Sequence, residues 1–68
     1  MSQRELAKIR IEVLIRLAEK VEKDLREAYE RIPAYFSAKP YIHRALRNVE
    51  NMRKIIRELD SFISSHKG

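Results

Sequence analysis

Apolar residues recur along the first half of the chain at alternating spacings of four and three, the repeat of one face of a long amphipathic helix. This first heptad stripe consists of Ala7, Ile11, Leu14, Ala18, Val21, Leu25, Ala28 and Ile32. Ser2 and Glu5 provide the S-x-x-E pattern of a capping box, and Pro33 disfavours helical geometry at the residue before it. The pattern predicts a helix over about residues 2–32.

A second heptad stripe of the same kind runs through the second half of the chain. It consists of Ile42, Ala45, Val49, Met52, Ile56, Leu59 and Ile63. Pro40 is tolerated only in the first turn of a helix, and Ser37 is suited to the N-cap position. We expect the second helix at about 40–65, joined to the first by a turn over about 33–39.

The two stripes match when the helices fold back on each other. Counted from the turn, Ile32 lies near Ile42. The same count predicts that Val21 packs near Met52 and Leu14 near Leu59. A connection of about seven residues is usual between neighbouring antiparallel helices. The prediction is an all-α fold, an antiparallel two-helix hairpin that forms a single domain over residues 1–68.

The chain also carries more apolar residues than one hairpin can cover. A second row, Leu6, Ile9, Val13 and Leu17, lies beside the first stripe, and Ile15, Leu46, Ile55 and Phe62 flank the two stripes. The residues left over for an interface are Leu6, Ile9, Val13, Leu17, Ile55 and Phe62. A helix with so wide an apolar arc is normally covered from two sides, and a chain of this length has a small core. We expect these six residues to form the interface of a homodimer, a four-helix bundle. The alternative is that they pack against a different protein.

Composition narrows the class of protein further. The 68 residues include 15 Lys and Arg against 10 Asp and Glu, a formal net charge of +5, and no cysteine, which excludes disulfides and thiolate metal sites. The densest apolar segment, residues 9–18, contains three charged residues and is shorter than the roughly 20 residues of a membrane span. The first residues lack the apolar segment of a signal peptide. We expect a cytoplasmic protein with no membrane attachment.

Positive charge is concentrated in the second half, where seven basic residues face three acidic ones over 33–68. A basic row runs from the turn along the second helix, opposite its stripe: Lys39, His43, Arg44, Arg47, Lys54 and Arg57. Tyr35 lies beside it in the turn. Such cations attract phosphates or an acidic protein surface, and an exposed ring can stack on an unpaired base or anchor a protein. The row is either a binding site of this kind or a solvated helix face.

Nothing in the sequence favours catalysis. No group of His, Cys, Asp and Glu has the spacing of a metal site, and no Gly-rich phosphate loop is present. We expect neither an enzyme nor a cofactor, a metal or a small-molecule substrate. The leading prediction is a small helical assembly or adaptor module that acts through protein–protein contacts. Its alternative is an accessory protein that binds DNA or RNA along the basic row.

One short segment adds a remote alternative. Residues 56–63 resemble the S-Q-E-L-D-x-x-I signature of the Spo0E-like aspartyl-phosphate phosphatases at Glu58, Leu59, Asp60 and Ile63. Those proteins are also short antiparallel helical hairpins, and the resemblance implies action on the phosphoaspartate of response regulators. An isoleucine and an arginine stand at 56 and 57, where the family has Ser and Gln. The activity is therefore not carried over to this chain.

Overall fold

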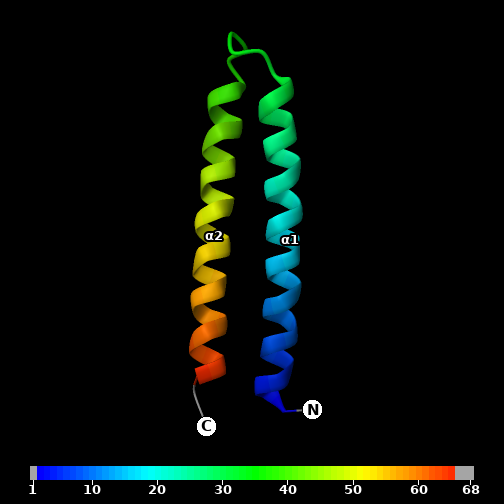
Figure 1. The fold of residues 1–68 in the computed structure, drawn as a ribbon, viewed down its shortest axis with the longest axis vertical. Helices are drawn as coiled ribbons and strands as arrows, with labels where there is room; N and C mark the ends of the chain where they lie inside the picture. Colours follow the sequence, from blue (N-terminus) through cyan, green and yellow to red (C-terminus); the bar gives the residue numbers. More distant parts are fainter. Residues whose placement is uncertain (1, 66–68) are drawn as a thin grey trace.

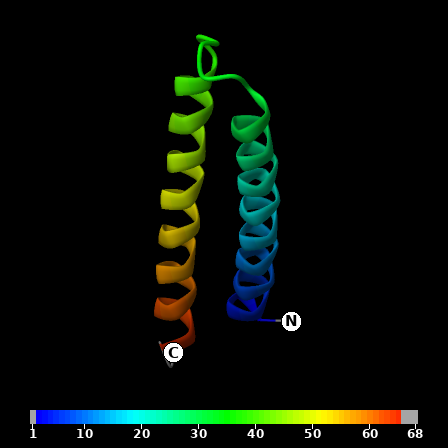
Figure 2. The ribbon, with the colours of Figure 1, turned by 45° about the horizontal axis from the view of Figure 1, so that its top comes forward.

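The computed structural model describes residues 2–65 as two antiparallel helices, which confirms the all-α hairpin (Figure 1). Helix α1 spans Gln3–Arg31 and helix α2 spans Lys39–Ser65, close to the expected 2–32 and 40–65. The helices lie side by side along their whole length (Figures 1 and 2), in a rod of 53 × 17 × 12 Å. We call the end where α1 begins and α2 finishes the open end, and the other the turn end.

The limits of α1 follow from its capping residues. Ser2 has an extended backbone (φ −75°, ψ 159°), and its Oγ accepts a hydrogen bond from the Glu5 N–H at 3.1 Å. This bond pairs one of the amides that the first turn of a helix leaves free. At the other end, Ile32 is extended (φ −84°, ψ 126°), as expected for a residue before proline. The predicted start and stop signals of α1 are both present.

The start of α2 differs by one residue from the prediction. The Ile42 N–H donates to the Ala38 carbonyl at 3.1 Å, which makes Ala38 the N-cap residue in place of Ser37. Alanine has no side-chain acceptor, so the first turn of α2 has no side-chain cap of the kind that Ser2 provides for α1. Pro40 is the second helical residue, a position where a missing N–H removes no intrahelical bond.

The helices meet along a seam in which every residue is buried or half-buried. From α1 the seam contains Ile11, Ile15, Ala18, Glu22, Leu25, Tyr29 and Ile32, and from α2 it contains Ile42, Leu46, Val49, Arg53, Ile56, Asp60 and Ile63. Among the described residues, Ile11, Ala18 and Leu46 are the apolar ones less than one tenth exposed. The fully covered core of the hairpin is therefore small.

The seam corrects the predicted packing at four positions. Leu14 and Leu59 are each 48% exposed, Val21 is 45% exposed and Met52 is 54% exposed, so the predicted pairs do not fill the hairpin interior. Neighbouring residues occupy their places, and three of these neighbours are charged: Glu22, Arg53 and Asp60. Successive helical residues are about 100° apart. About every second position of the seam is held by the residue that follows a stripe residue. The centre of each stripe therefore points about 40° away from the direction of the other helix.

An ion-pair network holds the middle of the seam. Glu22 is 8% exposed, and its Oε1 accepts a hydrogen bond from Arg26 Nη2 at 2.9 Å. Its Oε2 lies 3.2 Å from Arg53 Nη1 on the other helix. A carboxylate this buried is stable only with cationic partners, and Glu22 has one from each helix.

Within residues 2–65, neither helix is long and apolar enough to cross a membrane.

Candidate functional site: an apolar face and a basic cleft

The two broad sides of the hairpin can be assigned from one ion pair across the helices. Glu19 follows the seam residue Ala18, Arg57 follows the seam residue Ile56, and Arg57 Nη2 donates to Glu19 Oε1 at 3.1 Å. Residues that follow seam positions therefore share one side in this antiparallel pair, which we call the polar side. Residues that precede seam positions share the opposite side.

That opposite side is an apolar face built from both helices. Its members precede a seam residue or lie one helical turn from one that does, except Ile9, which lies one turn from Val13 at the outer edge of the face. They are Leu6, Ile9, Val13, Leu14, Leu17 and Val21 from α1, with Met52, Ile55, Leu59 and Phe62 from α2, and each is 41% to 63% exposed. The face brings together all six residues expected at the dimer interface. It also contains the four that the sequence pattern had placed inside the hairpin.

The apolar face occupies the part of the hairpin nearer the open end. Along α1 it runs from Leu6 to Val21, about 22 Å at 1.5 Å per residue. Arg10 lies within this arc, where its aliphatic stem can cover apolar neighbours while the guanidinium stays in water. Scattered apolar residues are normal on a protein surface, whereas large contiguous apolar patches are typical of interaction sites.

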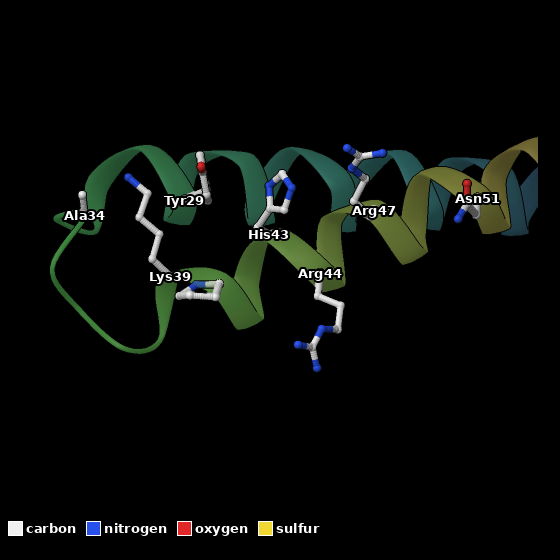
Figure 3. A pocket seen from close by; sticks show the side chains of 8 residues that line it. Tyr29, Ala34, Lys39, His43, Arg44, Arg47 and Asn51 are labelled. Carbon is white, nitrogen blue, oxygen red and sulfur yellow. The ribbon is translucent and has the colours of Figure 1, made fainter.

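A basic cleft of about 750 Å³ lies at the turn end. Ala34 and Pro40 contribute its apolar part, and its polar lining comes from Tyr29, Lys39, His43, Arg44, Arg47 and Asn51. The side chains of His43, Arg47 and Asn51 extend from α2 on one side, and Arg44 points away from them (Figure 3). Three fully charged cations and a histidine line the cleft, and no carboxylate is among its lining residues. It suits an anionic ligand.

Lys39 is fixed at the mouth of this cleft. Its Nζ donates to the Ile32 carbonyl at 3.0 Å and lies 4.4 Å from the centroid of the Tyr29 ring. The ring of Tyr29 in turn lies 5.5 Å from the ring of His43. The carbonyl at the end of α1 and the π face of tyrosine both stabilise an ammonium group. An ammonium has three N–H donors, so two remain available to a ligand.

The basic row predicted from the sequence is divided between two environments. Near the turn, Arg47 is exposed and makes no ion pair with any residue in 2–65. Nearer the open end, Lys54 is exposed and Arg57 is paired with Glu19. Within the basic row, the cations without an acidic partner in residues 2–65 are therefore mainly those near the turn, Lys39, Arg44 and Arg47.

Exposed aromatic rings lie at the turn end, next in sequence to residues that line the basic cleft. Tyr35 is 83% exposed and packs edge to face on Phe36, with centroids 5.1 Å apart. Tyr41 is 67% exposed and carries the guanidinium of Arg44 at 5.5 Å from its centroid. Two tyrosines are thus adjacent in sequence to cleft residues, Tyr35 to Ala34 and Tyr41 to Pro40, and each presents its ring to solvent.

Residues 2–65 contain no cluster of three or more His, Asp or Glu that could hold a metal ion. Asp60, on which the phosphatase resemblance depends, lies in the seam. Its Oδ1 is enclosed and has no hydrogen-bond partner there, a poor position for contact with a partner's phosphoaspartate.

Comparison with known proteins adds no relative. No protein-family model matches the chain, and neither a curated protein nor a solved structure matches it.

Proposed function

We propose that this protein is a non-enzymatic helical assembly module that dimerises through its apolar face into a four-helix bundle. The observation that supports this most strongly is the rotation of both heptad stripes away from the seam. The polar side and the turn end of each hairpin then remain at the surface, where the dimer can present them to partners.

The direction of the rotation favours a four-helix arrangement. In such a bundle each helix has two adjacent helices. Seen from one helix, the common core lies about 45° from the direction of either adjacent helix. Both stripes are turned by about 40° and toward the same side of the hairpin. A hairpin that packed alone would point both stripes directly at each other, and Glu22, Arg53 and Asp60 would not be in the seam.

The apolar face is large enough to drive association. Completing the burial of a half-exposed Leu, Ile or Phe contributes ~1 kcal/mol, so ten such residues contribute ~10 kcal/mol per chain and twice that for the pair. Association costs roughly 4–15 kcal/mol. A second copy is the favoured occupant because a two-fold axis places two identical apolar faces against each other, and both helices contribute to the face.

Sedimentation equilibrium at micromolar concentration tests the proposal. The wild-type protein is expected at twice the chain mass of 8.1 kDa. Val13→Glu places a carboxylate in the middle of the apolar face and should dissociate the dimer. Ser61→Glu is the matched control, because it adds the same charge at an exposed position on the polar side.

Two results would count against the dimer. A wild-type chain that is fully helical and monomeric at these concentrations would show that the hairpin is stable alone. A Val13→Glu variant that remains dimeric would show that copies meet through another surface. A monomer that folds only on binding a different protein would instead support the alternative occupant of the apolar face.

A further inference from the structure

The basic cleft lies within a single hairpin and away from the apolar face, so it calls for its own ligand. We propose that it binds the phosphates of single-stranded nucleic acid while the exposed ring of Tyr35 in the turn stacks on a base. This proposal does not rest on dimerisation.

Charge selects the class of ligand. Lys39, His43 and Arg47 converge on the cleft from successive turns of α2, and no acidic side chain among the lining residues offsets them. Arg57, by contrast, faces Glu19. Lys39 is already oriented by the Ile32 carbonyl and the Tyr29 ring, so little side-chain entropy is lost when its two remaining N–H groups bind a phosphate.

The exposed aromatic ring selects a single strand over a duplex. A ring in water can stack on a base only when the face of that base is free, as it is in an unpaired strand. Tyr35 offers such a ring in the turn, next to the cleft residue Ala34. Tyr41 precedes the seam residue Ile42 and contacts Arg44, so it lies on the other side of α2. From Lys39 to Asn51 the lining extends about 18 Å along α2, a length over which a strand can contact several cations.

The binding experiment uses fluorescein-labelled 12-nucleotide oligo(dT) and oligo(U), with a duplex of equal length for comparison, and follows anisotropy from 50 to 200 mM salt. Single strands should bind more tightly than the duplex. If Lys39 and Arg47 each contact a phosphate, the logarithm of affinity should fall with the logarithm of salt at a slope of about −1.4. The RNA and DNA arms show whether the sugar matters.

A pair of charge-matched variants places the binding in the cleft. Arg47→Ala should weaken binding at 50 mM salt about fivefold and make the salt slope shallower by about 0.7. Lys23→Ala removes the same charge from an exposed site on α1 outside the cleft and should change affinity by less than about twofold.

A second pair tests the stacking. Tyr35→Ala should weaken binding about tenfold, whereas Tyr35→Phe should bind like the wild type because stacking needs only the π face. Circular dichroism should show unchanged helicity in both, since this side chain is 83% exposed.

Several results would overturn the proposal. These are no binding of any oligonucleotide at 50 mM salt, tighter binding of the duplex, and equal effects of Arg47→Ala and Lys23→Ala. A fluorescein-labelled poly-glutamate peptide that binds as tightly as the oligonucleotides would also reject it, and would favour an acidic protein partner for the cleft.

Discussion

The two ends of the hairpin expose large side chains for different reasons. Toward the open end, both helices present half-exposed aliphatic and phenyl groups on one side, with Arg10 among them. At the turn end, the exposed groups are tyrosines and cations around an open cleft. The first composition suits burial against another apolar surface, and the second suits a charged ligand that stays partly in water. We therefore propose separate surfaces of one short hairpin for assembly and for ligand binding.

The largest difference between the two ends should appear in stability. Leu17→Ala on the apolar face should lower the free energy of dimer unfolding by about 2–4 kcal/mol per chain, because the residue is buried once two faces meet. Tyr35→Ala at the turn end should cost less than about 0.5 kcal/mol, since its ring is exposed in both states. Urea unfolding at one protein concentration measures both, and similar small losses would show that the apolar face is not buried.

The charged part of the seam gives a sharper test of the hairpin itself. Glu22→Ala should lower the free energy of unfolding by about 2 kcal/mol, because the half-buried Arg53 loses the carboxylate with which it pairs. The double variant Glu22→Leu with Arg53→Leu should recover most of this loss, since apolar residues can replace a buried ion pair. A double variant that is less stable than the single one would mean that the pair contributes more than its desolvation costs.

The two helix starts should also differ. Ser2→Ala should lower the free energy of unfolding by about 1 kcal/mol, because it removes the hydroxyl that accepts a hydrogen bond from the Glu5 N–H. Ser37→Ala should be nearly neutral, because the N-cap position of α2 belongs to Ala38. Thermal unfolding of both variants at equal concentration checks this, and an equal loss would show that Ser37 caps α2 in solution.

The smallest expected effect concerns the cleft. Lys39→Ala should lower the free energy of unfolding by about 0.5–1 kcal/mol, because it removes the hydrogen bond to the Ile32 carbonyl and the cation–π contact with Tyr29. Lys54→Ala is the control for an exposed lysine on α2 and should have no measurable effect. If the two lysines prove equivalent, Lys39 is not held in place as the structure shows.

The fold followed from the sequence because each of its determinants is local. The heptad spacing, Ser2 with Glu5, and Pro33 act within a few residues of each other, and all the elements they predict are present. The side of each helix that packs against the other was predicted less well. Leu14 and Val21 were placed in the hairpin because an apolar stripe was taken to face the nearest partner.

In a larger helical bundle, an apolar stripe points between the two adjacent helices. The heptad spacing alone does not distinguish such a stripe from one that faces a single adjacent helix. The charged residues in the seam were the available signal. Glu22 and Arg53 occupy seam positions on facing helices, which a purely apolar template overlooks.

Four of the eight residues that line the cleft belong to the basic row expected from the sequence. Lys39, His43, Arg44 and Arg47 were assigned to one basic row with Lys54 and Arg57. Helical periodicity placed them together on α2, but it could not show that Glu19 from α1 would pair with Arg57. Tyr29 was missed as a lining residue because its role depends on contact across the turn with Lys39 and His43.

The concentration dependence of thermal unfolding tests the central claim most directly, namely that the hairpin supplies half of a core. For a chain that folds only as a dimer, the midpoint of unfolding rises with protein concentration, because dissociation accompanies unfolding. We predict a steady rise over a hundredfold range of concentration. A midpoint that stays constant over that range, in a protein that sediments at 8.1 kDa, would contradict the account.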